Sequence, residues 1–572
     1  MIVYRDRREK VEGPNAIHEI ATQIGRLRRQ DAVEHQDVVS LLTDFGEFEA
    51  SVVDAVPSEP IVGLVREAAV RIGHAFYWSW EGSATRVRFW MERVQRTIDQ
   101  IAALPLPQNL SVSVSEGYAY YALAPETYLE AAKQFRLDVG PAEVACVGIR
   151  SIGTSLSAIV AATLQEQGCR AESFTVRCGG HPFDRSWQPD PATAERVRTM
   201  RDRHWLIVDE GPGLSGSSLC CVAAKLAELG VPEGRIAFFP SHDLDSSRLL
   251  SESARDRWPR HRKYIADFDD VWVRSGRLTR SLPEGRLVDI SAGRWRPLLF
   301  DDESAYPAVL SWHERRKYLL YPAGSEPLLL KFAGFGRYGQ SILDRAMLLA
   351  QVGSHTPVVG LCNGFLVTRL VPGNPMCLAD VDEPFLDRVV EHLAWLRRVA
   401  ATAEPMSPEE LMQMIEVNIH EGLGPQWADQ FRRAGLAAPV DNHGTGVTDG
   451  RMLLHEWLRT SDGYVKTDSV DHYADHFSPS CSDSAWDMAA CLVEWGLSPS
   501  MQNSLIRRYV DATGDGGLPK RLPFYAIAYL AHRLGYATMT AQTLGDESAD
   551  GRRFETLAGN YGRLLKARLA EL

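Results

Sequence analysis

Short apolar runs alternate with longer helical stretches between about residues 111 and 300. Stretches of amphipathic or Ala- and Leu-rich sequence at 156–167 and 217–229 separate the runs at 144–149, 172–177, 205–208 and 235–239. Short apolar runs between helices are typical of a parallel sheet that is buried on both faces. The sequence therefore predicts an α/β domain over residues 111–300.

The regions on either side of this domain have different patterns. Residues 1–110 are mainly helical in pattern; the stretch 80–104 has apolar residues at helical spacing and is ended by Pro105 and Pro107. These residues carry no chemical motif, so we expect them to serve packing, a lid or a homo-oligomer surface. Residues 301–572 start with strand candidates and continue with long helical stretches, which predicts a second, α+β domain; the strands are expected at 317–321, 327–332 and 364–371, and helices at 384–403 and 485–494.

Length and charge agree with a multidomain enzyme of small molecules. A chain of 572 residues is too long for one hydrophobic core. With 62 Lys and Arg against 74 Asp and Glu, the net charge of −12 argues against nucleic acid or an anionic membrane as the main partner. The nine cysteines include no C-x-x-C pair, and no apolar run approaches the roughly 18 residues of a membrane span. No signal peptide is visible, so we expect a cytoplasmic protein.

The most informative segment is 205–218, in which an apolar strand leads into an acidic loop and then a helix. Asp209 and Glu210 end the strand, and a turn of small residues, 211–218, opens the helix. Backbone N–H groups and serine hydroxyls at a helix N-terminus suit a phosphate. The two acids would repel a phosphate, so their targets are hydroxyls or a metal. A ribose 5-phosphate group meets both requirements, although a plain small-residue turn with solvated acids is the alternative.

This segment resembles the phosphoribosyl-pyrophosphate (PRPP) loop of type I phosphoribosyltransferases. The resemblance implies that Asp209 and Glu210 hold the ribose hydroxyls and that Ser215, Gly216, Ser217 and Ser218 hold the 5-phosphate. The loop is one residue longer than the usual pattern. The residues that contact the phosphate can therefore differ by one position from those named. The family transfers the ribose phosphate to an acceptor and releases pyrophosphate, with Mg²⁺ and cations neutralising the leaving group.

Two further segments lie where this family places functional loops. Residues 148–155 follow the strand at 144–149, and the resemblance implies that Arg150 and Ser151 bind pyrophosphate. A plain connection between strand and helix is the alternative. The segment 178–190, with His181, Asp184 and Arg185, lies at the position of the family's mobile catalytic loop.

A Gly-x-Gly-x-x-Gly pattern at 334–339 follows an apolar strand and precedes a helix. The pattern formally matches a dinucleotide fingerprint, which also requires an acid about 20 residues further on. No Asp or Glu occurs between Arg345 and Ala379, so we rank a dinucleotide site low.

The last third carries acids in an order that resembles the aminoglycoside phosphotransferase and choline kinase group. The segments are 449–457, 463–471 and 483–487. The resemblance implies that Lys331 binds ATP phosphates, that 364–372 forms the hinge between two lobes, that Asp449 is the catalytic base and that Asp468 binds Mg²⁺. Asp483 and Asp487 are expected to anchor the catalytic loop.

This pattern departs from the family in two places. Thr448-Asp449-Gly450 stands where His-Gly-Asp is usual, and the expected metal-binding Asn falls near 454–456. Because Mg²⁺ prefers oxygen ligands, Glu456 is our candidate metal ligand rather than His455. Asn442-His443-Gly444 is an alternative origin for the loop.

Isolated histidines near acids occur at His242, at 312–314 and at 471–472. Such residues are usually surface or core groups, so we assign them no metal. Together the motifs predict a bifunctional enzyme that transfers a phosphoribosyl group from PRPP to a small-molecule acceptor and phosphorylates a related metabolite with ATP and Mg²⁺. The alternatives are a phosphoribosyltransferase with a non-catalytic pseudokinase domain, and a regulatory protein that senses PRPP or nucleotides.

Overall fold

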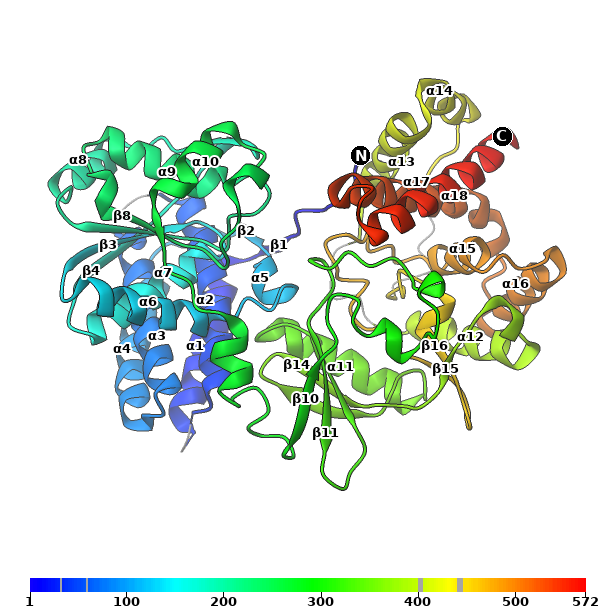
Figure 1. Cartoon of the computed structure of the whole chain (residues 1–572), viewed down its shortest axis with the longest axis horizontal. Helices are drawn as coiled ribbons and strands as arrows, with labels where there is room; N and C mark the ends of the chain where they lie inside the picture. The colour runs from blue at the N-terminus through cyan, green and yellow to red at the C-terminus, as the bar shows by residue number, and fades with distance from the viewer. Residues whose placement is uncertain (31–32, 58–59, 400–404, 440–445) are drawn as a thin grey trace.

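The computed structural model describes residues 1–30, 33–57, 60–399, 405–439 and 446–572. Figure 1 shows two bodies side by side, one formed by the blue to green part of the chain and the other by the green to red part. The first contains a parallel sheet and the second an antiparallel sheet with many helices, so the predicted mixture of α/β and α+β architecture is present. No helix of the described residues is both long enough and apolar enough to cross a membrane.

Residues before 110 are mainly helical, as predicted. The helices are α1 (Gly13–Arg29), α2 (His35–Ala55), α3 (Ile61–Trp80) and α4 (Ala84–Ala102). In α1 the buried residues recur every three or four positions and form one apolar face; they include Ile17, Ile20, Ile24 and Leu27. Gly82 and Ser83 lie between α3 and α4, so the predicted 80–104 helix begins only at Ala84.

These helices are part of the α/β body. Strand β1 (Arg8–Val11) pairs with β2 (Leu110–Ser113), across the predicted boundary at residue 110. Helix α3 packs so closely on α7 (Gly153–Glu166) that a Cβ on Gly73 would lie 2.7 Å from the carbonyl oxygen of Ala158. The N-terminal helices therefore cover one face of the parallel sheet.

The parallel sheet has the spatial order β4-β3-β7-β8-β9, and every neighbouring pair is parallel. Its strands are β3 (Glu143–Ile149), β4 (Arg170–Val176), β7 (His204–Val208), β8 (Ile236–Phe239) and β9 (Arg262–Lys263). The other helices of this body are α5 (Glu116–Ala119), α6 (Pro125–Val139), α8 (Pro191–Thr199), α9 (Ser217–Glu228) and α10 (Glu252–Arg257). The strand order reverses between β3 and β7, and ligands of such sheets bind at the carboxyl ends of the strands that flank this reversal.

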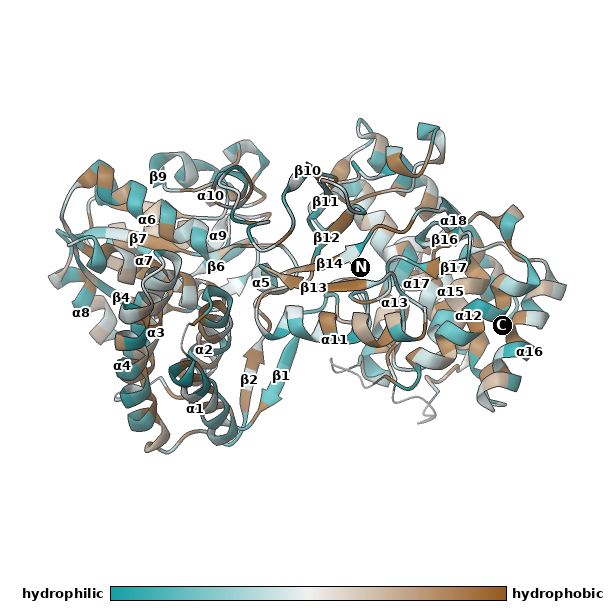
Figure 2. Cartoon of the chain, turned by 90° about the horizontal axis from the view of Figure 1, so that it is seen from below, coloured by the Kyte–Doolittle hydropathy of each residue, from teal (hydrophilic) through white to brown (hydrophobic). Residues whose placement is uncertain are grey.

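Both faces of this sheet are covered. In β3, Val144 and Cys146 belong to the core shared with the N-terminal helices, and Ala145 and Val147 belong to the core under α9. Figure 2 shows the hydrophobic strands lying between helices on both sides. Alternate burial on two faces explains why these strands appear as continuous apolar runs in the sequence.

The second body begins with an antiparallel sheet in the order β10-β11-β12-β14-β13. Its elements are β10 (Gly285–Asp289), β11 (Lys317–Pro322), β12 (Leu328–Phe332), α11 (Arg337–Gln351), β13 (Val358–Cys362) and β14 (Phe365–Arg369). Because β10 pairs with β11, this sheet starts at Gly285, before the boundary that we placed between residues 300 and 301. We call residues 285–369 the sheet lobe.

A helical lobe, residues 374–572, follows a connecting segment at 370–373. It contains a small sheet with the order β15-β16-β17. Its elements are β15 (Asn374–Pro375), α12 (Glu383–Leu396), α13 (Pro408–Leu423), α14 (Pro425–Ala434), β16 (Trp457–Thr460), β17 (Gly463–Lys466), α15 (Ala485–Glu494), α16 (Pro499–Thr513), α17 (Leu518–Leu544) and α18 (Ala549–Ala570). The predicted helix 384–403 is α12 up to Leu396, and its residues 400–403 lie outside the described residues.

The glycines of the 334–339 pattern form the contact between the two bodies. A Cβ on Gly336 would lie 3.0 Å from the hydroxyl of Ser40 on α2, and the N–H of Phe335 donates to the carbonyl of Tyr118. Arg337 lies 2.7 Å from the carboxylate of Glu47, also on α2. The loop therefore packs closely against α2, and this packing does not favour a dinucleotide site there.

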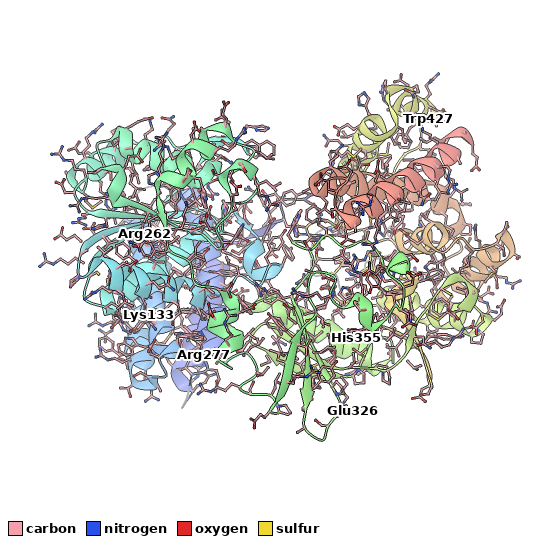
Figure 3. The ribbon with its side chains drawn as sticks, viewed as in Figure 1. Lys133, Arg262, Arg277, Glu326, His355 and Trp427 are labelled. Atoms are coloured by element: carbon pink, nitrogen blue, oxygen red, sulfur yellow. The ribbon has the colours of Figure 1, made fainter. Side chains whose placement is uncertain are left out.

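The segment before the sheet lobe also packs on α3: the guanidinium of Arg277, labelled in Figure 3, lies 3.7 Å from the ring centre of Trp80. Residues 1–7, which we call the N-terminal arm, run from β1 to the helical lobe, as the blue trace of Figure 1 shows. There Arg7 donates hydrogen bonds to the carbonyls of Tyr473, Asp475 and Ser478.

Candidate functional site

The acidic loop and the 148–155 loop lie side by side at the reversal of the parallel sheet. Strands β3 and β7 are in register with Gly148 opposite Val208, so the chain leaves both strands at the same edge of the sheet, after Ile149 and Val208. A Cβ on Gly153 would lie 3.3 Å from Oδ1 of Asp209. The fold thus brings together two segments that are about 60 residues apart in the sequence.

The carboxylates of Asp209 and Glu210 are half-buried, and no Lys or Arg of the described residues forms an ion pair with them. Burial raises the pKa of Asp209 to about 7 and, with repulsion from Glu116, the pKa of Glu210 to about 8. The backbone of the pair is fixed, because the Tyr128 hydroxyl donates to the Asp209 carbonyl at 2.8 Å. Two carboxylates held this way are suited to accept hydrogen bonds from neutral hydroxyls.

The serine turn lies at the start of α9. Gly216 is the residue before the helix and has a φ of +67°, which favours glycine. Ser215 accepts a hydrogen bond from the N–H of Ser217, and the Ser217 hydroxyl donates to the carbonyl of Pro182 at 2.7 Å. Ser218 is half-buried on the first turn. The turn has the N–H groups and hydroxyls of an anion site, with the Ser217 hydroxyl already engaged.

The 148–155 loop has its arginine turned toward α2. A guanidinium nitrogen of Arg150 lies 2.8 Å from Oδ1 of Asp54, and Arg177 pairs with the same carboxylate. Ser151 has a φ of +143°, a conformation that residues other than glycine rarely adopt. Pyrophosphate binding by Arg150 and Ser151 stays a prediction, and it requires Arg150 to exchange Asp54 for the ligand.

The segment 178–190 forms a two-stranded hairpin of β5 (Gly179–His181) and β6 (Asp184–Ser186). Its tip lies against the serine turn through the bond between Ser217 and Pro182. The hairpin is mostly exposed. The hairpin therefore lies beside the acidic site, where a covering loop is expected. Its role as a catalytic loop stays a prediction.

A cavity of about 1170 Å³ lies between the sheet lobe and the helical lobe. The segment 370–373 lines it at the expected hinge, and Lys331 and Asp468 line it from opposite lobes. Residues 290–316, which we call the cover segment, join β10 to β11 and also line the cavity. Arg296 of this segment pairs with Asp550 of α18 at 2.7 Å, so the cover segment bridges the two lobes.

Lys331 lies on the third strand of the sheet lobe, β12, and its ammonium is paired inside the cleft. Nζ lies 2.5 Å from Oδ1 of Asp468 and 2.9 Å from Oδ2 of Asp471. Burial opposes the charged form of this lysine, but the two carboxylates keep its pKa above the ordinary value. The sequence motifs thus located one lysine and one aspartate that meet across 137 residues of chain.

Asp449 and Glu456 are neutralised by a lysine that sequence reasoning did not identify. Nζ of the fully buried Lys466 lies 2.8 Å from Oε2 of Glu456 and 3.5 Å from Oδ2 of Asp449. Arg451 lies 2.7 Å from the other oxygen of Glu456. A signal was available in the sequence, because Lys466 stands two residues before Asp468; in the structure it is the last residue of β17.

These contacts test the expected magnesium site. Both oxygens of Glu456 are bound by cations. Asp468 is paired with Lys331 and lies 3.4 Å from Nε2 of His472. Ligand atoms of Asp449, Glu456 and His472, and of Asp468, Asp471 and His472, lie within 4.8 Å of one another. Metal binding by Glu456 and Asp468 stays a prediction, and it requires both carboxylates to exchange their present cations for Mg²⁺.

The anchoring expected of Asp487 is present. Its carboxylate accepts hydrogen bonds from the N–H groups of Asp449 and Gly450 at 2.7 and 2.9 Å. Asp483 instead pairs with Arg521 at 2.8 Å. The alternative loop origin, Asn442-His443-Gly444, lies outside the described residues.

Comparison with known proteins finds no matching family model and no matching curated protein. Among solved structures, the chain is similar to a choline/ethanolamine kinase family protein from Mesorhizobium loti (17% identity, 44% of this chain and 85% of that one, TM-score 0.33). It is also similar to the macrolide 2′-phosphotransferase MphH from Brachybacterium faecium (14%, 51% and 98%, TM-score 0.33). A third is the spectinomycin phosphotransferase APH(9)-Ia (8%, 45% and 89%, TM-score 0.33).

At a TM-score of 0.33, these similarities support no conclusion about the function of this chain. None of the three proteins is a phosphoribosyltransferase by name. What residues 285–572 show by themselves is a lysine on the third strand, Lys331, that meets Asp468 across the cleft between the two lobes.

Proposed function

We propose that the α/β body is a phosphoribosyltransferase that takes PRPP as its magnesium complex. The observation that carries this proposal is that the acidic pair, the serine turn and the 148–155 loop, chosen from the sequence, lie together at the reversal of the parallel sheet. Asp209 and Glu210 would accept hydrogen bonds from the ribose hydroxyls, and the turn at 215–218 would hold the 5-phosphate. The bond between C1 of the ribose and pyrophosphate breaks as a nucleophilic acceptor bonds to C1.

The kinase-like part has a different predicted role within the same proposal: it binds a nucleotide such as ATP in its cleft without transferring phosphate efficiently. Lys331 would turn from Asp468 to the nucleotide phosphates. Asp449, the expected base, is fully buried and lies between Lys466, His392 and His472 at 3.3–3.6 Å. This crowding favours the pseudokinase alternative over a second catalytic activity.

Pyrophosphate release from PRPP with pooled bases, amides and amines tests the first activity. Replacing Asp209→Asn together with Glu210→Gln should abolish release. The control is Asp202→Asn with Glu228→Gln, two exposed acids of the same body, which should release pyrophosphate at the wild-type rate. Unchanged release by the first variant would refute the assignment of the acidic loop.

Equilibrium binding of ATP, measured beside phosphate transfer, tests the kinase-like part. Lys331→Met should weaken ATP binding at least tenfold, whereas Lys225→Met, an exposed-face substitution on α9, should leave it unchanged. Efficient transfer of phosphate from ATP that Asp449→Asn abolishes would show a working kinase and contradict the pseudokinase assignment.

A further inference from the structure

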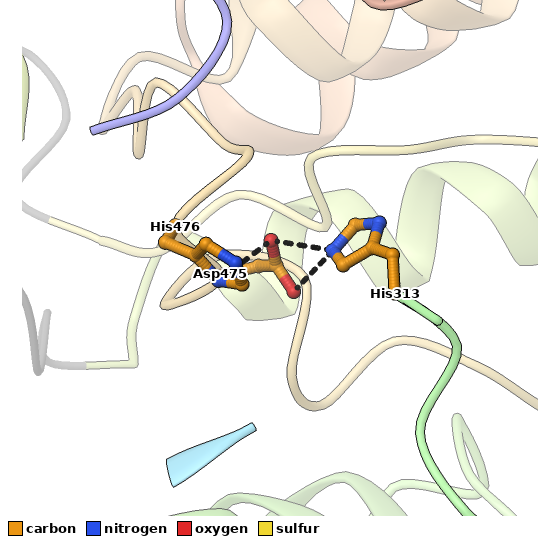
Figure 4. Close-up of side chains that lie close together, drawn as sticks. All are labelled: His313, Asp475 and His476. Atoms are coloured by element: carbon orange, nitrogen blue, oxygen red, sulfur yellow. Dashed lines mark hydrogen bonds and ion pairs between the residues drawn. The ribbon is translucent and has the colours of Figure 1, made fainter. Parts of the chain in front are cut away.

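Three side chains meet where the cover segment reaches the helical lobe. His313 comes from the cover segment, and Asp475 and His476 come from the segment between β17 and α15 (Figure 4). Nε2 of His313 lies 3.1 Å from Oδ1 of Asp475, and Nδ1 of His476 lies 3.6 Å from the same oxygen. The mechanism proposed above uses none of these residues.

The spacing of the three ligand atoms suits a tetrahedral metal ion. Zinc is bound by His nitrogen and carboxylate oxygen at about 2.0–2.2 Å, which places neighbouring ligand atoms about 3.3 Å apart. The two separations from Asp475 bracket this value, and all three ligand atoms lie within 4.8 Å of one another. The site needs little rearrangement to close around an ion.

The second nitrogen of each imidazole is held by a phenol. Nδ1 of His313 lies 2.9 Å from the hydroxyl of Tyr536, and Nε2 of His476 contacts the hydroxyl of Tyr121. The rings are thereby oriented with their remaining nitrogens toward Asp475. Metal-binding histidines are commonly fixed in this way by hydrogen bonds to the far ring nitrogen.

His476 supplies an independent sign that a ligand is missing. The residue is fully buried, and its Nδ1 has no hydrogen-bond partner among the described residues. A buried ring nitrogen without a partner is costly, and a metal ion at this point would satisfy it.

The charges around the cluster permit a cation. The Asp475 carboxylate faces the imidazoles of His313 and His476, and no Lys or Arg side chain of the described residues forms an ion pair with it. Arg315 is close, but its guanidinium is bound to Asp471 at 2.7 Å and to a backbone carbonyl. Arg7 likewise donates to backbone carbonyls.

We propose that His313, Asp475 and His476 bind a divalent transition-metal ion, for which zinc is the best match. His313 and Asp475 line the cavity between the lobes, so the fourth coordination position opens toward it. The ion would fix the cover segment to the helical lobe. Since Tyr121 belongs to the α/β body, it would also tie the two bodies at one point.

The test uses the full chain, stripped with a chelator and titrated with Zn²⁺ and, separately, with Co²⁺. Wild type should bind one ion per chain, show the visible absorption of tetrahedral Co²⁺, and gain several degrees in Tm with Zn²⁺. His313→Ala and Asp475→Asn should lose all three responses. His420→Ala, an exposed histidine of α13, should keep them.

His313→Ala is the primary variant, because its side chain is partly exposed and its loss threatens folding less than that of His476. Circular dichroism of both variants establishes that they are folded. Absence of stoichiometric metal in wild type, or unchanged metal binding in both folded variants, would overturn the proposal. The test does not measure PRPP turnover. The outcome of the metal test is therefore independent of the function proposed for the α/β body.

Discussion

At the scale of single residues, the cleft between the sheet lobe and the helical lobe is lined by buried charges that neutralise one another. Lys331 and Lys466 face Asp449, Glu456, Asp468 and Asp471, and Arg315 and Arg451 complete the set. Breaking a buried pair by removing one partner is strongly destabilising, because the remaining charge is left without compensation. Lys466 serves two carboxylates and is therefore the most sensitive position.

Lys466→Met should lower the free energy of unfolding by about 3–5 kcal/mol, since Asp449 and Glu456 both lose their buried cation. Urea denaturation at neutral pH measures this. Lys225→Met, which removes an exposed pair with Glu228, should stay within about 0.5 kcal/mol of wild type. A loss for Lys466→Met no greater than that of the control would contradict the assigned role.

The acidic pair predicts a dependence of stability on pH. The folded-state pKa values of Asp209 and Glu210 are raised to about 7 and about 8, so the unfolded state ionises first as pH rises. Their contribution to stability is therefore present below about pH 4 and lost as pH rises to 8. Between pH 5 and 8.5, the free energy of unfolding of wild type should fall by several kcal/mol more than that of the Asp209→Asn, Glu210→Gln variant. Denaturation curves at several pH values for both proteins check this, and parallel pH profiles would contradict it.

Motifs located single residues well where the chemistry requires a fixed type at a fixed spacing. Asp209 and Glu210 follow the end of β7, Lys331 and Asp468 line the cleft, and Asp487 lies on the first turn of α15. The partners of such residues come from distant segments, and no local pattern predicts them. Asp54 on α2, which holds Arg150, is an example.

At the scale of elements, strands and helices followed the apolar pattern closely. The predicted helix 485–494 is α15, and the strand 144–149 is β3 extended by one residue. Strand β10 escaped prediction because its burial pattern is mostly exposed or intermediate, with no apolar run. The boundary that we placed near residue 300 stays a prediction; strand β10, which precedes it, pairs with β11, which follows it.

The loop at 334–339 gives a prediction at this scale. A Cβ on Gly339 would lie 2.2 Å from the carbonyl oxygen of Gly334, so Gly339→Ala forces the loop to move away from α2. We expect a loss of about 1–3 kcal/mol in the free energy of unfolding. Gly559→Ala in α18 has open space around the new methyl group and should be stabilising by about 0.5–1 kcal/mol. Thermal and urea unfolding of both variants measure these changes in the free energy of unfolding. Equal changes would contradict the packing role of the loop.

At the scale of the whole molecule, the two bodies share a hydrophobic core. Residues of α2 and α3 belong to one cluster with Leu330, Phe332 and Phe365 of the sheet lobe. Because apolar surface of each body is covered by the other, neither is expected to remain soluble when expressed alone. The sequence did not predict this shared core, because its contacts come from segments that are hundreds of residues apart.

The N-terminal arm gives the last prediction. Arg7→Ala removes hydrogen bonds to three backbone carbonyls of the segment that carries Asp475 and His476. The free energy of unfolding should fall by about 2–3 kcal/mol, and amide exchange in residues 473–480 should become faster. Arg8→Ala removes only an exposed pair with Asp6 and serves as the control. Unchanged exchange in 473–480 would show that the arm does not hold this segment.

The arm also constrains how the protein is made. Arg7 leaves the ribosome early, but its acceptors around Tyr473 follow 466 residues later. At typical synthesis rates of 5–20 residues per second, the arm waits roughly 20–100 s for its partners. During that interval the helices of the α/β body can form, whereas the segment that carries Asp475 and His476 does not yet exist. The contacts of the arm with the helical lobe can therefore form only after residues 473–480 have been synthesised.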